Sequence, residues 1–223
     1  MLSPLALLLA DARTPSGSYA HSGGLEAAVQ SGLRDPDDIV GFLNGRLHTV
    51  ARVEAAVAAA AVRAARRLDL GALAELDDEA VARCPSPPLR HAASALGRAL
   101  LRAGTGFWPE APALVRYRSQ SSATPRPVAL GVLGAAAALQ PRDLAVISLY
   151  DDLAGVASAA VKLLPIDSVT ALSWVVAMGP DLERAAGDAA APRPAAALWS
   201  ASSVLVDLRS VDHRTNEGRL FVT

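Results

Sequence analysis

The chain has 223 residues, of which 52% are hydrophobic and only 4% aromatic, and its formal net charge is −1. A nucleic-acid-binding protein normally carries a basic face, so a nearly neutral chain argues against that class. Cys84 is the only cysteine, which excludes a disulfide framework and a thiolate metal cluster. Alanine and leucine dominate, and this composition predicts an all-α fold. So many alanines indicate close helix packing or a shared partner surface, although a GC-rich genome would also produce them.

The first twelve residues contain an apolar run that imitates a signal peptide. No basic residue precedes the run, so we interpret it as a first buried helix. The longest stretch without charge, 127–141, is shorter than the ~18–20 residues that a membrane span needs. These features predict a soluble, cytoplasmic protein.

Helix signals follow in chain order. Ser3-Pro4 opens a helix that ends near Asp11, and residues 13–19 are rich in turn formers. Ser22 or Gly23 is expected to cap a short helix that runs to about Ser31 and is closed by Gly32. Asp35-Pro36 opens the longest helix, to about Arg67, along which one apolar stripe repeats at three- and four-residue steps.

The second half of the chain continues this pattern. A short helix is expected before the proline break at 85–88, another starts at Ser86-Pro87, and 104–112 reads as a connector. Further helices are predicted over 127–139, 141–163, 167–190 and 193–210, and 211–223 reads as a polar tail. The prediction is one helical domain over residues 1–223, with about eight to ten helices.

Several kinds of catalytic chemistry lack their sequence signals. A P-loop needs Lys followed by Ser or Thr, but Lys162, the only lysine, precedes Leu163. The four histidines lack the i,i+4 spacing of helical metal sites, although a cluster formed only by the fold stays possible. No Gly-x-Ser-x-Gly motif occurs, while spacing alone does not exclude a Ser/His/Asp triad. The sequence therefore gives no support for an enzyme.

One N-terminal string is specific. It runs from Leu7-Leu8-Leu9-Ala10-Asp11 through Pro15-x-Gly17-Ser18-Tyr19-x-His21 to Ser22-x-Gly24-Leu25-Glu26. A tight turn at Pro15 and Gly17 joins two helices, and Glu26 lies in the positive first turn of the second. This string resembles the helix, turn and Ser-x-Gly-Leu-Glu entry of the urease accessory protein F family.

The C-terminus is also similar to this family. His213 stands six residues before Arg219-Leu220-Phe221, and the chain ends at Thr223. An apolar pair after a polar tail would fray unless it docks, either on its own domain or on another chain. The family ending has Glu after this histidine, a common aromatic and a final Ser, where this sequence has Arg214, Glu217 and Thr223.

Two internal segments extend the resemblance. Tyr150 and the later Lys162-x-x-Pro165 are similar to a family stretch that glutamines usually follow, and Ser168 and Leu172 occupy those places here. Arg90-x-x-x-Ser94-x-x-Gly97-Arg98 also resembles a family helix. The matching motifs cover about a third of the chain and lie in the family's order.

The resemblance implies an all-helical homodimer that assists nickel insertion into urease. Family members bridge a second accessory protein, D or H, and a nickel-carrying GTPase, accessory protein G, which deliver Ni²⁺ to apo-urease. The implied role needs no catalytic residue, resident cofactor or stably bound metal, and no nucleic acid or membrane. The residues that it implies for partner binding are Tyr19, His21, Ser22, Glu26, Tyr150, Lys162, His213, Arg219, Leu220 and Phe221.

Three alternatives belong to other classes. A metallochaperone would bind nickel directly through His21 and His213. A helical ligand-responsive regulator should carry a basic recognition helix, which the charge balance disfavours. A hydrolase would need a pocket with converging titratable groups. The resemblance implies that the tail 213–223 docks the accessory partner, supported by Tyr19 and His21, and that Tyr150 and Lys162 face the GTPase.

Overall fold

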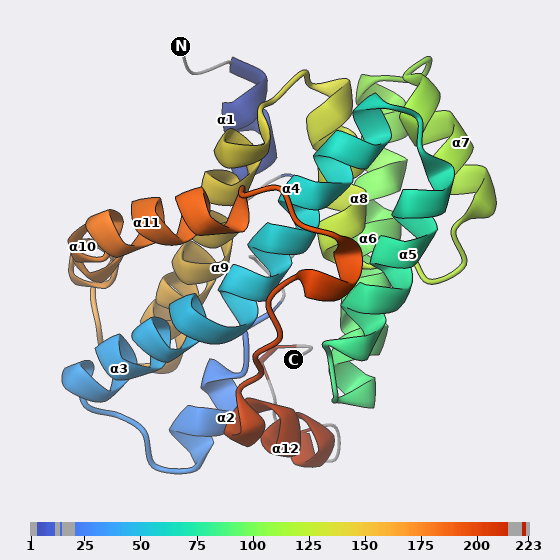
Figure 1. The fold of residues 1–223 in the computed structure, drawn as a ribbon. Helices are drawn as coiled ribbons and strands as arrows, with labels where there is room; N and C mark the ends of the chain where they lie inside the picture. Colours follow the sequence, from blue (N-terminus) through green and yellow to red (C-terminus); the bar gives the residue numbers. More distant parts are fainter. Residues whose placement is uncertain (1–3, 12–13, 15–20, 214–219, 222–223) are drawn as a thin grey trace.

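The computed structural model describes residues 4–11, 14, 21–213 and 220–221, with the side chains of 212 and 213 left out of that description. The regular structure of these residues is helical, so the predicted all-α fold is confirmed (Figure 1). The helices are α1 (Pro4–Ala10), α2 (Leu25–Gln30), α3 (Pro36–Arg46), the π-helical turn η1 (Leu47–Ala51), α4 (Arg52–Arg66), α5 (Leu70–Ala82), α6 (Pro87–Phe107), α7 (Pro112–Gln120), α8 (Arg126–Ala136), α9 (Pro141–Leu163), α10 (Ser168–Ala177), α11 (Gly179–Ala189), the 3₁₀ turn η2 (Ala195–Ala197) and α12 (Val204–His213).

Helix α4 runs through the middle of the molecule and packs against α5, α8, α9 and α11 (Figure 1). Its alanines are almost all buried. A Cβ atom placed on Gly131 of α8 would lie 2.4 Å from the Ala61 Cβ and 2.7 Å from the Ala58 carbonyl oxygen. The small residues of α4 and α8 therefore permit close helix packing, which is one of the explanations that the composition left open.

The long helix expected from Asp35-Pro36 to Arg67 is present as α3, η1 and α4 in succession. Its apolar stripe is buried at Ile39, Leu43, Leu47, Val53 and Val57. The π-helical turn was not predicted, because a wider turn leaves no mark in the hydrophobic period. It directly follows Arg46, a buried charged residue described below.

The prediction of a connector over 104–112 is wrong for its first four residues, because α6 continues to Phe107. A Cβ atom at Gly104 would come within 2.9 Å of the Leu133 side chain. The glycine there permits close packing of α6 on α8 and does not end the helix. The segment after it forms the short helix α7, which the sequence analysis did not predict.

The single helix expected over 193–210 is also wrong. The structure has the short turn η2, then an extended connector, and only afterwards α12. Prolines at the start of this segment disfavour a helix. Arg83, the C-cap residue of α5, donates to the carbonyl oxygens of Trp199 at 2.8 Å and Leu198 at 3.1 Å. The Arg52 guanidinium also lies 3.7 Å from the centre of the Trp199 ring. These long-range contacts outweigh the helix propensity of the alanines.

One other expectation about the helices changed in detail. The helix predicted over 167–190 is divided into α10 and α11, with Gly179-Pro180 at the start of α11. Among the described helices, α9 alone is long and apolar enough to span a membrane, and 67% of its most apolar window is buried inside the protein. That burial is typical of the core helix of a globular protein.

Candidate functional site

The segment that links α1 to α2 ends in a tight platform, residues 21–26, for the C-terminal helix. Gly23 and Gly24 have φ angles of +63° and +90°, which favour glycine. A Cβ atom on Gly24 would lie 2.7 Å from the Val206 Cγ1 atom of α12. Gly24 is the N-cap of α2, in place of the expected Ser22 or Gly23, and the Ser22 Oγ accepts the Glu26 N–H at 3.2 Å.

Glu26 fixes Leu220 and Phe221 to this platform. Its side chain is buried, and its carboxylate accepts the backbone N–H of Leu220 at 2.6 Å and of Phe221 at 3.1 Å. A carboxylate that accepts two backbone N–H groups forms strong charge-assisted hydrogen bonds. The Glu26 side chain thus acts as the partner of a chain segment nearly 200 residues away.

The last two described residues have opposite surroundings. Phe221 is only 4% exposed and belongs to the hydrophobic core, and Lys162 Nζ of α9 lies 5.3 Å from the centre of its ring. Leu220 is 69% exposed. The sequence left open whether this pair docks on its own domain or on another chain. In the structure Phe221 packs on its own chain, and Leu220 is exposed to solvent.

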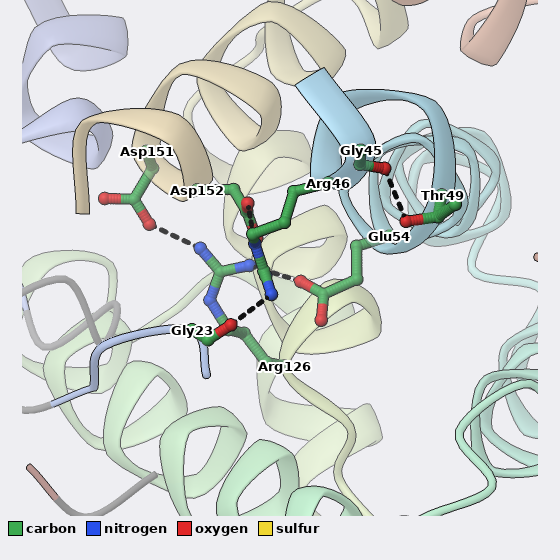
Figure 2. A network of polar contacts seen from close by, with 8 residues as sticks. All are labelled: Gly23, Gly45, Arg46, Thr49, Glu54, Arg126, Asp151 and Asp152. Carbon is green, nitrogen blue, oxygen red and sulfur yellow. Dashed lines mark hydrogen bonds and ion pairs between the residues drawn. The ribbon is translucent and has the colours of Figure 1, made fainter. Parts of the chain in front are cut away.

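A buried ionic cluster lies beneath the platform (Figure 2). We define it as Arg46, Glu54, Arg126, Asp151 and Asp152. Arg46 donates from Nε and Nη2 to the two carboxylate oxygens of Asp152, at 2.8 and 2.5 Å. Arg126 donates to Glu54 Oε2 at 2.6 Å and also to Asp151 Oδ2. Side chains from α3, α4, α8 and α9 therefore meet at one point in the core.

Burial and charge act against each other in this cluster. Burial disfavours the charged form of Arg126, but Glu54 and the two aspartates raise its pKa above the usual value. Burial raises the pKa of the Glu54 carboxyl, and Arg126 offsets this only in part. Burial and the charge of Arg126 together lower the pKa of the nearby His21. Buried ions of this kind are tolerated only because each one is paired.

The ionic cluster and the platform are connected through one hydrogen bond. Arg46 Nη1 donates to the Gly23 carbonyl oxygen at 2.6 Å, as Figure 2 shows. The same guanidinium holds Asp152 of α9. The cluster therefore fixes the backbone on which α12 and the C-terminus rest, and it links the outer platform to the core helix α9.

The other residues expected to bind partners lie in several places. Tyr19 and Arg219 are outside the described residues, as is the side chain of His213 at the end of α12. Tyr150 is 41% exposed on α9, and Lys162, three turns later on the same helix, is also exposed. The structure thus brings Glu26, Lys162 and Phe221 together and leaves Tyr150 outside this contact.

His21 was also a candidate ligand for a directly bound nickel ion. It is half-buried at the edge of the ionic cluster. Within the described part of the chain, no three His, Cys, Asp or Glu side chains are grouped so that they could hold a metal ion. The second proposed ligand, the imidazole of His213, falls outside that part.

The sequence analysis missed the ionic cluster and the outer face of α12. A signal for the cluster was present, because Asp151 and Asp152 interrupt the otherwise apolar helix 141–163. Charged residues in the centre of a buried helix are rare unless they are paired. The second signal is Arg126, which directly precedes the long uncharged stretch 127–141.

These features define a class of protein. It is an all-α protein in which a buried ionic cluster supports the platform that holds Leu220 and Phe221. Apolar faces of some of its helices are exposed. The family model of UreF matches residues 33–179. The chain belongs to this family of urease accessory proteins.

Individual relatives agree along almost the whole chain. The urease accessory protein UreF of Mycolicibacterium vanbaalenii is 36% identical over 219 residues, which cover 97% of each chain. The UreF proteins of Mycobacterium marinum and Mycobacterium tuberculosis are 33% and 31% identical, with 98% and 97% of each chain covered. The resemblance inferred from the N-terminal and C-terminal motifs is confirmed at the level of the family.

Proposed function

We propose that this chain is a non-catalytic, cytoplasmic scaffold for urease maturation. It holds the nickel-carrying GTPase, accessory protein G, together with a second accessory protein, D or H, so that nickel reaches apo-urease. It acts as one domain without a resident cofactor, and it needs no nucleic acid or membrane. Membership of the UreF family supports this role.

The observation that carries the proposal is an apolar surface of α12, beside the docked Phe221, that is exposed in the described part of the chain. Helix α12 turns Val206 toward the platform and leaves its other apolar side chains in solvent. These residues, together with Leu220, are the α12 surface: Val204, Leu205, Leu208, Val211 and Leu220, each between 52% and 69% exposed. An amphipathic helix with an exposed apolar stripe is suited to bind in the groove of a partner protein. We assign this surface to accessory protein D or H.

Leu208→Glu combined with Leu220→Glu should abolish capture of accessory protein D or H in a pull-down assay. Burial of two leucines on a partner stabilises a complex by roughly 3–6 kcal/mol before ordering costs, so a loss of about 100-fold in affinity is expected. Both side chains are exposed, so the helical circular dichroism spectrum should not change.

Val115→Glu provides the matched control, because Val115 is 53% exposed on α7, away from the α12 surface. It should bind the partner as the wild type does. Normal capture by the double variant would exclude the α12 surface as the docking site for this partner.

We assign the exposed side of α9 to the GTPase. Lys162→Ala should weaken GTPase capture by about tenfold, because it removes an exposed cation that can pair with an acidic surface. Lys162→Arg keeps the charge and should retain most of the binding. Since Lys162 also lies over Phe221, a thermal melt must accompany the binding assay. Equal binding by the alanine variant would contradict the assignment.

We further propose that α10 forms the homodimer interface. Val169, Leu172 and Val176 follow one another at helical spacing and are 76%, 45% and 77% exposed. This face lies apart from the α12 surface, so both can be occupied together (Figure 1). Sedimentation at micromolar concentration should give twice the 22.9 kDa protomer mass, and Val176→Glu should give the protomer. A monomeric wild type would contradict this proposal.

A further inference from the structure

A cavity separates the ionic cluster from α12. It has a volume of about 180 Å³ and lies between α4 and α6, with the start of α8 and the middle of α9 at its inner end and α12 at its outer end. Most of its wall is apolar, from side chains such as Val53 of α4 and Leu89 and Leu96 of α6. Val206 of α12 closes part of the outer end. We refer to it as the α12 cavity.

Carboxylates outnumber cations around the α12 cavity. The ionic cluster has three carboxylates and two guanidinium groups, and Asp207 adds a further carboxylate on the α12 side. The remaining arginine in the wall, Arg83, is already paired with Glu79 and with carbonyl groups of the connector. The pKa of His21 is lowered, so this imidazole adds no positive charge near neutral pH.

Glu54 is paired with Arg126 through one carboxylate oxygen, and its second oxygen can accept from a ligand. In the described structure only its Oε2 atom contacts Arg126, and Figure 2 shows the other oxygen turned away from that guanidinium. The Glu54 side chain is 26% exposed, more than the side chains of Arg126 and Asp151 with which it shares the ionic cluster. Cys84 lies in the same wall. Burial raises the pKa of its thiol to about 11, and the charges of Glu54 and Asp207 add to this effect, as expected for a negative potential in the cavity.

Size and charge together define a ligand class. An apolar protein cavity of about 150 Å³ is large enough to bind benzene. The α12 cavity is slightly larger and has an acceptor oxygen of Glu54 at its charged end. We propose that the α12 cavity is a binding site for a small organic monocation, with an apolar body about the size of one ring and an ammonium group that pairs with Glu54. This inference is independent of the scaffold role and of the partner surfaces.

Calorimetric titration of the full-length protein with benzylammonium tests the proposal. Toluene and benzoate serve as probes of nearly the same shape that are neutral and negatively charged. Benzylammonium should bind with a millimolar or lower dissociation constant and raise the thermal midpoint. Toluene should bind at least about tenfold more weakly because it lacks the charge-assisted hydrogen bond, and benzoate should not bind.

Two variants and one control locate the site. Glu54→Gln should weaken benzylammonium binding at least about tenfold, whereas Glu183→Gln, which changes an exposed carboxylate on α11, should not. Ala93 of α6 lines the cavity, so Ala93→Phe should fill it and remove binding while the charges stay in place. If Glu54→Gln does not fold, benzylammonium binding by Ala93→Phe alone tests whether the ligand occupies the α12 cavity.

Three outcomes would overturn the proposal: no binding of benzylammonium by the wild type, equal binding of the three probes, or undiminished binding by Ala93→Phe. Undiminished binding by a folded Glu54→Gln variant would also overturn the pairing with Glu54. A negative result for the cation site would not contradict the proposed capture of accessory proteins through the α12 surface, because the capture assays test different residues.

Discussion

Arg126→Met should lower the free energy of unfolding by about 3–5 kcal/mol, enough to unfold a large part of the protein near physiological temperature. Arg126 is 7% exposed and is the common partner of Glu54 and Asp151. Methionine fills much of the same volume but leaves both carboxylates without their buried cation. Chemical denaturation followed by circular dichroism measures the loss.

Arg142→Met is the matched control, because Arg142 and Glu183 form an ion pair in which both side chains are more than half exposed. Such pairs contribute about 0–1 kcal/mol. Adding Glu54→Gln and Asp151→Asn to Arg126→Met should restore part of the stability, since the cost comes from unpaired charge and not from lost volume. A loss similar to that of Arg142→Met would mean that the ionic cluster does not support the fold.

The pH dependence of the Arg126→Met variant should have a definite sign. Without the guanidinium, buried carboxyls bind protons more tightly in the folded state than in the unfolded state, as burial already raises the pKa of Glu54 in the intact cluster. The folded variant then takes up protons first as the pH falls. Its deficit relative to the wild type should therefore shrink toward acidic pH and be largest above neutral pH.

Phe221→Ala should lower the free energy of unfolding by about 3 kcal/mol, a large effect for a residue so close to the C-terminus. The reason is that the ring is 4% exposed in the core, and its own N–H is held by Glu26. Thermal and urea unfolding measure the effect. Leu220→Ala, which changes the adjacent exposed residue, should alter stability by less than about 0.5 kcal/mol.

This pair of variants also separates two roles of the C-terminus. If Phe221→Ala weakens the fold while Leu220→Glu weakens only partner capture, the docked ring is a structural strap and its neighbour is part of the binding surface. Should Phe221→Ala leave stability unchanged, the contact of the C-terminus with Glu26 would not hold the fold together.

The parts of the fold that follow from local sequence were predictable. The helix 141–163 begins and ends at the predicted residues, and the rod from Pro36 to Arg66 is nearly as expected, because capping residues and an apolar stripe mark them. The connector before α12 was not predictable in this way. Its conformation depends on the Arg83 guanidinium, which lies more than 100 residues earlier in the sequence. Helix propensity is a property of the local sequence, so it does not include such a contact.

The candidate site was predictable only in part. The Ser-x-Gly-Leu-Glu string correctly singled out Glu26 and Gly24, but the sequence did not reveal that Glu26 binds the C-terminus or that Gly24 makes room for Val206. Both contacts join residues about 180 or more positions apart. The ionic cluster likewise draws its members from four helices, so no single stretch of sequence displays it.

The Arg83 contacts set a limit on how far the C-terminal helix can travel. They anchor the connector as far as Trp199, so only residues 200–203 join that fixed point to α12. Four residues span at most about 14 Å when fully extended. If a partner moves α12 away from Gly24, these four residues still limit the distance between Trp199 and the start of α12, so the helix stays near α2 and α6. The first turn of α12 must therefore stay near the fixed connector, and a partner that binds this helix has to do so close to the platform.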